Sequence, residues 1–300
     1  MPAPLSADPA PAYVWCDGAL LPAAEARIPL VSQTHDAACA VFEGIRAYDA
    51  RLFLAAAHFD RFARSADLMG YALPWTTPDL IAAAEAVLWA SGLGDAYLRP
   101  IAWRSGDSPS APCSGGTIHT AIFAWPWPET GAPPGLRLVL SDWRRPAPDT
   151  APTAAKCAGL CLAGTLARAA ARAAGHDDAL MLDACGHVAA ATTANIVLLK
   201  DGALVSPRPT CFVDSLTKRH VFTLARALGL AVRETRVTLA DLDAAQEVFV
   251  TGTATGLRPV ISLSRPDRHS VWPPGPVSEA LREKFHATTR APAAITALHS

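Results

Sequence analysis

The chain has 300 residues, of which 51% are hydrophobic and 18% are charged, and its formal net charge at pH 7 is −1. A chain of this length and apolar content can bury a sizeable core, which excludes disorder as its main state. The near-neutral charge balance provides no electrostatic footprint for nucleic acid or for an anionic membrane surface. We therefore expect an enzyme that acts on a small molecule.

Seven cysteines are scattered along the chain, an odd number that does not indicate a disulfide framework. No cysteine pair is combined with a second pair or with histidines at zinc-ligand spacing, so no metal is expected. The N-terminal residues lack the basic and apolar segments of a signal peptide, and no apolar run could span a membrane. These features predict a reduced, cytoplasmic protein without a membrane partner.

The first half of the chain predicts a mixture of strands and helices. Extended segments are expected at residues 13–21, 25–31, 42–48, 51–54, 97–103 and 117–125. The helical spacing of apolar residues predicts one helix at 56–69 and a second that begins at Thr77, with Pro78 in its first turn. We expect these elements to form a small α/β domain at residues 1–125.

A segment rich in proline and glycine follows this predicted domain. The eleven residues from Trp125 to Gly135 contain four prolines and two glycines, which excludes regular structure. We therefore expect an interdomain linker at residues 126–135 and a larger domain at residues 136–300.

The second domain again mixes strands and helices. Strands are expected at residues 136–143, 179–183, 187–190, 196–200, 203–205, 232–237 and 247–251. Helices are expected at residues 153–175, ending at Gly175, and at residues 215–229, 239–245 and 277–285. Strands and helices do not alternate regularly and no G-x-G-x-x-G opens a helix, which argues against a dinucleotide fold and for an α+β class.

Lys156 is the first candidate for chemistry. It lies in the apolar segment AAKCAGLCLAG of a chain that has only four lysines. An apolar setting disfavours the charged ammonium and leaves the amine as a nucleophile that can form a Schiff base. The alternative is a surface lysine whose stem packs near a helix start, and this alternative stays open on the residue alone.

Three further features could bind an anion. Thr251-Gly-Thr-Ala254 follows an apolar strand, Ser215-Leu-Thr217 opens a helix, and Arg61 lies early in another helix. Each feature alone is compatible with an ordinary cap or surface residue. Together with a Schiff-base lysine, they fit a cofactor that carries both an aldehyde and a phosphate.

Several motifs, in order along residues 13–286, resemble the fold-type IV, class IV pyridoxal-phosphate aminotransferases, and most closely the branched-chain amino acid aminotransferases. They are VFEGIRAY at residues 41–48, HFDR at 58–61, YLRP at 97–100, PTAAK at 152–156, SLTK at 215–218 and GTA at 252–254. The resemblance implies a two-domain fold with a small α/β domain and a larger cofactor-binding domain built on a strand-rich pseudo-barrel.

The resemblance also implies roles for individual residues and partners for the protein. Lys156 would be the Schiff-base lysine for pyridoxal 5'-phosphate (PLP). The phosphate would bind Arg61, Leu216, Thr217 and Thr253. The substrate would contact Phe42, Arg46, Tyr97, Arg99 and Ala254. The substrate would be an amino acid or amine, with a keto acid as amino acceptor, and the protein would be a homodimer.

The chain departs from the family pattern where the cofactor ring would lie. Leu160 and Cys161 replace an Asn-Tyr pair, and Ala190 replaces the glutamate that pairs with the pyridine nitrogen. Further departures are Ala37 for a tyrosine, Ser215 and Lys218 in the GITR motif, and Gly256 for an acid. A carboxylate keeps the ring nitrogen protonated and an alanine cannot. The hydroxyls of Thr192 or Thr193 could contact the nitrogen instead, or these threonines could serve only the strand.

Two interpretations follow from these departures. The family default is an aminotransferase, but Ala190 and Cys161 raise the prospect of a PLP-dependent lyase, racemase or biosynthetic enzyme that does not transaminate. The second interpretation is a former aminotransferase that has lost transamination and binds a ligand, or that uses the old pocket without PLP. Retention of Lys156, Arg61, Thr217 and Thr253 favours an enzyme that still uses PLP.

Overall fold

The computed structural model describes residues 10–28, 38–105, 116–128 and 135–291. The chain divides into two compact units, Met1–Thr130 with Ala155–Gly159, and Gly131–Ala154 with Leu160–Ser300. The division falls inside the linker expected at 126–135, of which residues 129–134 lie outside the described part. The short segment around Lys156 belongs to the first unit although its neighbours in sequence belong to the second.

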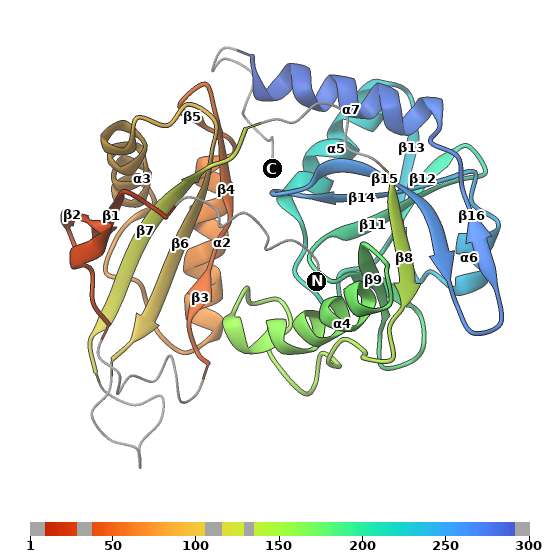
Figure 1. The fold of residues 1–300 in the computed structure, drawn as a ribbon, viewed down its shortest axis with the longest axis horizontal. Helices are drawn as coiled ribbons and strands as arrows, with labels where there is room; N and C mark the ends of the chain where they lie inside the picture. Colours follow the sequence, from red (N-terminus) through yellow and green to blue (C-terminus); the bar gives the residue numbers. More distant parts are fainter. Residues whose placement is uncertain (1–9, 29–37, 106–115, 129–134, 292–300) are drawn as a thin grey trace. The chain divides into compact units, whose positions relative to one another are not determined.

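The first unit is built on a seven-stranded sheet in the order β2-β1-β7-β6-β4-β5, with β3 paired to β6 (Figure 1). All its described pairings are antiparallel. Its strands are β1 (Tyr13–Cys16), β2 (Ala19–Pro22), β3 (Val41–Phe42), β4 (Ile45–Tyr48), β5 (Arg51–Leu52), β6 (Ala96–Arg104) and β7 (Ile118–Pro126). The strands expected at 97–103 and 117–125 are present as β6 and β7, whereas those expected at 42–48 and 51–54 are present only in part.

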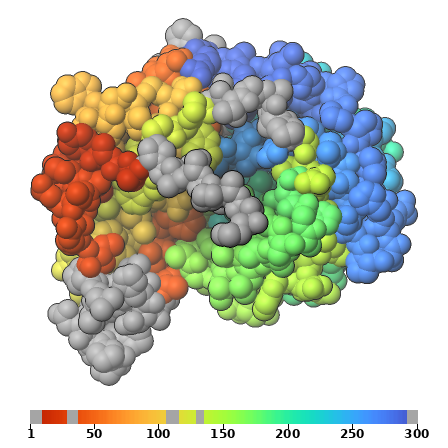
Figure 2. Space-filling view, viewed as in Figure 1, coloured from red at the N-terminus to blue at the C-terminus, as the bar shows by residue number. Residues whose placement is uncertain are grey.

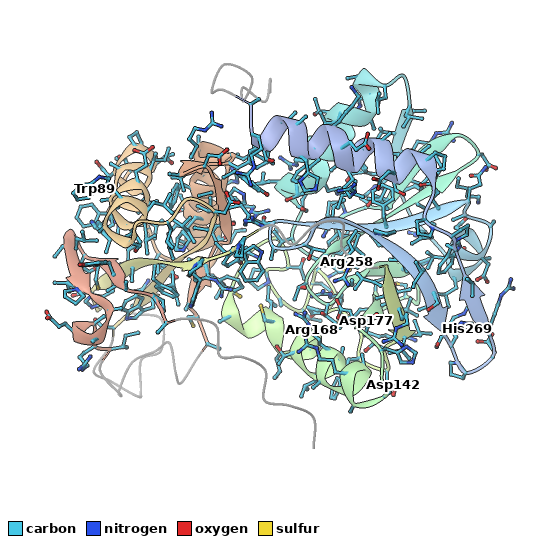
Figure 3. All side chains as sticks on the ribbon, turned by 45° about the horizontal axis from the view of Figure 1, so that its top comes forward. Trp89, Asp142, Arg168, Asp177, Arg258 and His269 are labelled. Carbon is cyan, nitrogen blue, oxygen red and sulfur yellow. The ribbon has the colours of Figure 1, made fainter. Side chains whose placement is uncertain are left out.

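Two helices accompany this sheet, α2 (Ala55–Leu68) and α3 (Thr77–Ser91). The apolar stripe of α2 buries Phe59 and Phe62 completely. The start of α3 is fixed by a capping box between Thr76 and Asp79, and Gly92 ends it in the left-handed region with φ 63°. On the outer side of α3, Trp89 is 85% exposed and stands clear of the ribbon in Figure 3.

The second unit contains a nine-stranded sheet in the order β10-β9-β8-β15-β14-β11-β12-β13, with β16 paired to β15. Its strands are β8 (Leu136–Leu140), β9 (Asp178–Leu182), β10 (Val188–Ala191), β11 (Asn195–Lys200), β12 (Ala203–Pro207), β13 (Ala231–Thr235), β14 (Glu247–Gly252), β15 (Gly256–Ser264) and β16 (His269–Val271). The two ends of the order meet where the Val188 N–H donates to the Val237 carbonyl at 2.8 Å. The sheet is therefore curled into a half-barrel, whose interior holds Leu138, Leu180 and Val250.

Four helices surround this half-barrel: α4 (Leu162–Ala173), α5 (Leu216–Ala227), α6 (Leu239–Asp243) and α7 (Pro276–Thr289). Helix α4 packs on β9, whereas α7 packs on β14, β15 and α5. The C-terminal residues, drawn in blue, form a continuous outer surface of the second unit in Figure 2. None of the helices in the described ranges is long and apolar enough to cross a membrane.

The mixed α+β class and the two-sheet architecture agree with the expected fold, but several element boundaries were wrong. The helix expected at 153–175 begins only at Leu162, after a 3-10 turn at Ala158–Cys161. Residues before that turn make long-range contacts instead, because Cys157 forms a β-bridge with Val41. Gly175, with φ 80°, follows the end of the helix as expected.

Other differences are smaller. The strand expected at 136–143 ends at Leu140, and that at 42–48 is interrupted at Glu43 and Gly44. Strands β15 and β16 were not expected, because Pro259 and the polar residues around it obscure the alternation. The segment at 25–31 contains no described strand, and its residues 29–31 lie outside the described part. Ala37 also lies outside it.

Candidate active site

A fully buried carboxylate in the first unit binds two side chains of one helix. Glu43 has an exposed fraction of 0% and lies between β3 and β4. Its two oxygens accept hydrogen bonds from Arg61 Nε at 2.7 Å and Arg61 Nη2 at 2.8 Å. The Nδ1 atom of His58 lies 2.8 Å from Glu43 Oε2. Because His58 and Arg61 are three residues apart on α2, the same helix face brings both to Glu43.

Contacts within this cluster determine the protonation states of Glu43 and His58. Burial raises the pKa of Glu43, but the positive charge of Arg61 and the hydrogen bond from His58 outweigh it and hold the pKa well below its usual range. Burial also lowers the pKa of His58, and Glu43 opposes this only in part. Glu43 is therefore an anion that fixes the direction of the Arg61 guanidinium.

Lys156 is anchored to the same helix through Ser65. The Lys156 N–H donates to Ser65 Oγ at 3.0 Å, and the Ser65 hydroxyl donates to the Arg61 carbonyl at 2.9 Å. On its other side, the Lys156 carbonyl accepts from the Phe42 N–H at 3.0 Å. The backbone of Lys156 is thus held between β3 and α2, one helical turn from Arg61.

The Phe42 ring brings two cations together. Lys156 Nζ lies 4.7 Å from the ring centroid, and Arg99 Cζ lies 4.8 Å from it. The Nε atom of Arg99 is buried and has no hydrogen-bond partner within the described ranges. An unpaired buried donor of this kind favours an anionic ligand beside it.

Tyr97 and Arg46 complete the predicted substrate residues of this unit. A Cβ at Gly44 would lie 2.0 Å from Tyr97 Oη, so the phenol can occupy its position only because residue 44 is glycine. Arg46 instead donates from Nη2 to the Trp127 carbonyl at 3.0 Å and lies over the Tyr48 ring. The structure therefore groups Phe42, Tyr97 and Arg99 with Lys156, whereas Arg46 is used in packing.

In the second unit, the start of α5 presents backbone donors. Ser215 is the N-cap, and its side chain accepts only from the Lys218 N–H, at 3.2 Å. The amides of Leu216 and Thr217 belong to the first turn, which has no intrahelical acceptor for them. The Thr217 side chain is 4% exposed. This end of the helix carries the partial positive charge that suits an anion.

The tight turn between β14 and β15 lies close to the β10–β11 loop. Gly252 pairs with Gly256, and a Cβ at Gly252 would come within 3.5 Å of Ala194. Asn195, which follows that loop as the first residue of β11, accepts through Oδ1 from the Ser215 N–H at 3.3 Å. The β10–β11 loop thus connects the GTA turn with the start of α5, which brings two of the predicted anion-binding segments together.

Within the GTA turn, Thr253 is half-buried and Ala254 is exposed. The hydroxyl of the preceding Thr251 is buried and has no hydrogen-bond partner in the part of the chain that the structure describes. Lys218, which replaces an arginine of the family motif, is fully buried and pairs with Asp214 at 2.8 Å and with Glu234. The charge of Lys218 is therefore paired with carboxylates of the same unit.

Residue 190 offers no carboxylate. Ala190 is 1% exposed and packs with Ala189, Cys211 and Phe212. Burial raises the pKa of the Cys211 thiol to about 11, so the thiol is neutral. The alanine therefore lies in an apolar cluster and itself supplies no acid.

The two candidate hydroxyls near residue 190 differ in their surroundings. Thr192 is buried and donates from Oγ1 to Asp178 Oδ1 at 2.5 Å, whereas Thr193 is exposed. Arg145 donates to the carbonyls of Ala191 and Thr192 at 2.7 and 2.8 Å, and burial lowers its pKa. The only proton of the Thr192 hydroxyl is thus committed to Asp178.

No metal was expected, and one group of possible ligands is nevertheless close together. Ligand atoms of Asp183, Cys185 and His187 lie within 4.8 Å of one another in the β9–β10 turn. Asp183 Oδ1 already accepts from the backbone N–H groups of Cys185 and His187, at 2.9 and 2.8 Å. The turn itself therefore accounts for this grouping.

Sequence reasoning did not identify Glu43, His58 or Ser65. A signal for Glu43 was present, because an acid in the apolar run VFEGI needs a buried cation. His58 could have been found from its i, i+3 spacing to Arg61. Ser65 carried no such signal, because its partner Lys156 is 91 residues away in sequence.

Comparison with known proteins places this geometry in context. Residues 40–263 match the family described as Amino-transferase class IV. The chain is 30% identical to the branched-chain-amino-acid aminotransferase of Pseudomonas aeruginosa, with 91% of each sequence covered. A crystal structure of a branched-chain aminotransferase from Thermoproteus uzoniensis with norvaline is 31% identical, with a TM-score of 0.88 over 93% of this chain and 95% of that one.

A third comparison concerns the cofactor. The branched-chain amino acid aminotransferase of Thermobaculum terrenum, solved in its PLP-bound holo-form, is 28% identical, with a TM-score of 0.85 over 93% of this chain and 94% of that one. The family match covers well over half of the residues, and both sheets of the chain share the fold of these enzymes. The chain is a fold-type IV enzyme that belongs to the class IV aminotransferase family and is similar to branched-chain amino acid aminotransferases.

Proposed function

We propose that this protein transfers amino groups with PLP bound covalently to Lys156. The phosphate would bind Arg61 of the first unit together with the Leu216 and Thr217 amides and Thr253 of the second. The residues fit such a group, because the first-turn amides of α5 have no intrahelical acceptor and Glu43 holds the guanidinium of Arg61 in a fixed direction. When bound, PLP supplies an aldehyde for imine formation and a ring that accepts electrons from the substrate.

The observation that carries this proposal is the shared anchoring of Arg61 and Lys156. Ser65 holds the carbonyl of one and the amide of the other, and Glu43 fixes the guanidinium of Arg61. A cation that binds phosphate and an amine that binds the aldehyde must keep a constant separation if both are to hold one molecule. Because both residues are anchored within one unit, the separation between Arg61 and Lys156 is held fixed.

The residues near Lys156 favour an aliphatic amino acid as the substrate. The donor of Arg99 suits the substrate carboxylate, whereas Phe42 and Tyr97 offer an apolar wall. Lys156 Nζ would take the proton from the substrate Cα and would deliver it to the former aldehyde carbon of the cofactor. The similarity to branched-chain aminotransferases supports leucine, isoleucine or valine as amino donors.

The test is a half-reaction with the PLP-loaded protein and leucine, without an acceptor. One equivalent of 4-methyl-2-oxopentanoate per bound cofactor, with loss of the original absorption band, is the expected result. Lys156→Ala should form none, whereas Lys284→Ala, a matched change on α7, should behave like the wild type. PLP binding without keto acid from any amino acid tested would contradict the proposal.

The apolar surroundings of Ala190 support a second candidate function. Without a carboxylate at this position, the ring nitrogen is a weaker base and the ring a weaker electron acceptor. Racemisation, elimination or lyase chemistry would then compete with amino transfer. Exchange of the substrate α-hydrogen for solvent deuterium, without formation of a keto acid, would favour this candidate over transamination.

We also infer a cytoplasmic homodimer. The cysteines in the described ranges are all free thiols, which suits a reducing compartment. The resemblance to the family supports a dimer with its active sites near the subunit interface. Light scattering at micromolar concentration should give about twice the 31.4 kDa mass of the chain, and a monomer would overturn the inference.

A further inference from the structure

A cavity in the second unit is lined by none of the residues proposed to hold Lys156, the phosphate or the substrate, and it shares only Thr193 with the candidates for the cofactor ring. It has a volume of about 310 Å³ and lies between α4, the start of β9, the β10–β11 loop and the β14–β15 turn. Arg168, Asp177 and Arg258 of its wall are seen together in the second unit in Figure 3. A cavity of this size suits a small molecule rather than a single ion.

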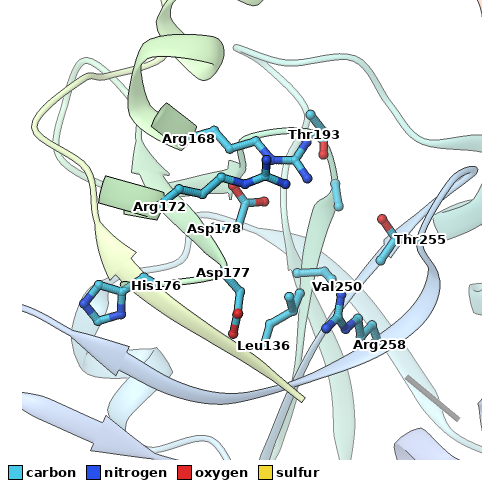
Figure 4. Close-up of a pocket in the computed structure, with 11 residues that line it drawn as sticks. Leu136, Arg168, Arg172, His176, Asp177, Asp178, Thr193, Val250, Thr255 and Arg258 are labelled. Atoms are coloured by element: carbon cyan, nitrogen blue, oxygen red, sulfur yellow. The ribbon is translucent and has the colours of Figure 1, made fainter. Parts of the chain in front are cut away.

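Arginines enter the cavity from two opposite sides. Arg168 and Arg172 come from α4, one helical turn apart, and Figure 4 shows both guanidinium groups beside Thr193. Arg258 comes from β15 on the other side, and Figure 4 shows its guanidinium beside Val250. Each side of the cavity therefore presents at least one guanidinium, which is a donor group for a carboxylate.

The aspartates in the wall accept hydrogen bonds from residues outside the cavity lining, and Asp177 also acts electrostatically on Arg258. Asp177 accepts from Arg137, through Nε at 3.2 Å and the backbone N–H at 2.8 Å. Asp178 accepts from Thr192 Oγ1. The Nε atom of Arg168 is buried and has no hydrogen-bond partner among the residues that the structure describes. A buried donor without an acceptor is costly, so its presence at a cavity wall points to a ligand that supplies the acceptor.

The wall between the two cationic sides is apolar. Leu136 is 6% exposed and Val250 is fully buried, and both line the cavity. They would contact the middle of a ligand whose two ends reach the arginines. Burial lowers the pKa of Arg258, with the charge of Asp177 opposing this, so a second anion beside Arg258 would stabilise its charged form.

We propose that this cavity is a binding site for an aliphatic dicarboxylate, with one carboxylate at Arg168 and Arg172 and the other at Arg258. The chemistry requires two acid groups joined by a short apolar chain. A molecule with one acid group would satisfy only one side, and inorganic phosphate would leave the apolar wall uncovered. The arginines of this site are distinct from the residues that we propose to hold the PLP phosphate and aldehyde, so its occupancy does not depend on that assignment.

The experiment is calorimetric titration of the PLP-loaded protein with succinate, using propionate and inorganic phosphate as comparison ligands. Succinate should bind at least tenfold more tightly than either, because it alone engages both sides. Equal affinities of succinate and propionate would overturn the proposal. Tighter binding of phosphate would assign the cavity to a single anion instead and would also overturn it.

Variants separate this site from the proposed active site. Arg168→Ala and Arg258→Ala should each weaken succinate binding about tenfold or more, and Arg172→Ala, at a more exposed position, provides a further variant if Arg168→Ala does not fold. Arg226→Ala, at an exposed position of α5, is the matched control and should change nothing. Succinate binding that is lost in Arg99→Ala but retained in Arg168→Ala and Arg258→Ala would place the ligand in the active site and contradict the proposal.

Discussion

Ser65 lies between Arg61 and Lys156 and hydrogen-bonds to the backbone of both, accepting from the Lys156 N–H at 3.0 Å and donating to the Arg61 carbonyl at 2.9 Å. Ser65 is 1% exposed, so water cannot replace either bond. A single hydroxyl thereby couples the segment that carries the reactive lysine to the helix that carries the phosphate-binding arginine.

Removal of this hydroxyl should loosen Lys156. We expect Ser65→Ala to lower the free energy of unfolding by about 1–3 kcal/mol, because the buried Lys156 N–H loses its acceptor. Urea unfolding measures this change. Thr223→Ala is the control, since Thr223 makes the same bond to the carbonyl four residues earlier but is exposed. Equal effects of the two variants would show that the contact with Lys156 adds no stability.

Arg61 should dominate the affinity for the cofactor phosphate. We expect Arg61→Ala to raise the PLP dissociation constant about tenfold or more, because a charged hydrogen bond contributes about 1.5–3 kcal/mol. Fluorescence titration of the apoprotein with PLP provides the measurement. Arg64→Ala, at an exposed position of the same helix, should leave the constant unchanged. An unchanged constant in Arg61→Ala would remove this residue from the phosphate site.

His58 should make the stability depend on pH below neutrality. Burial lowers its pKa from the ordinary value of 6.5, with Glu43 opposing this only in part. Below pH 6.5 the unfolded chain therefore binds a proton that the folded protein does not, and stability falls as the pH decreases. The contribution is fully present above pH 6.5 and is lost as the pH falls toward the lower, folded-state pKa.

Comparison with His58→Asn, which does not titrate, isolates this effect. The difference in unfolding free energy between wild type and variant should fall between pH 7.5 and 5.5, with a slope that approaches about 1.4 kcal/mol per pH unit. Urea unfolding at several pH values measures it. A difference that is constant over this interval would mean that folding leaves the pKa of His58 unchanged, and one that grows as the pH falls would mean that folding raises it; either would contradict the prediction.

Ala190 should limit transamination. We expect a low turnover of leucine and 2-oxoglutarate by the wild type, because residue 190 supplies no carboxylate to the pyridine nitrogen. Ala190→Glu should raise this rate about tenfold, whereas the isosteric Ala190→Gln should not. The tight packing around residue 190 makes overpacking the competing effect, which thermal unfolding detects. A wild-type turnover near ~10 per second would show that another group replaces the acid.

Elements that are defined by interactions between residues close in sequence were predicted well, whereas elements that depend on distant residues were not. The α2 helix and the start of α3 were predicted because apolar spacing and capping residues act locally. The start of α4 was placed nine residues too early, because the bridge between Cys157 and Val41 draws that segment away from the helix. Strand β15 was missed because its neighbours in the sheet, rather than its own pattern, define it.

The candidate site shows the same division. Lys156, Arg61 and Thr217 were found through ordered motifs, and their assignment to PLP stays a prediction. Glu43 and Ser65 act through partners that are distant in sequence, so no local pattern revealed their contacts. The dicarboxylate cavity was also invisible in the sequence, since Arg168 and Arg258 are 90 residues apart and look like ordinary surface arginines there.

The central claim is that Lys156 holds the cofactor, and reduction of the PLP-loaded protein with borohydride tests it most directly. Borohydride fixes the imine as a stable amine, and peptide mass mapping then locates the added pyridoxyl phosphate. We predict the added mass on the peptide that contains Lys156 and on no other. A label on Lys200, Lys218 or Lys284, or no label despite saturating PLP, would contradict the account.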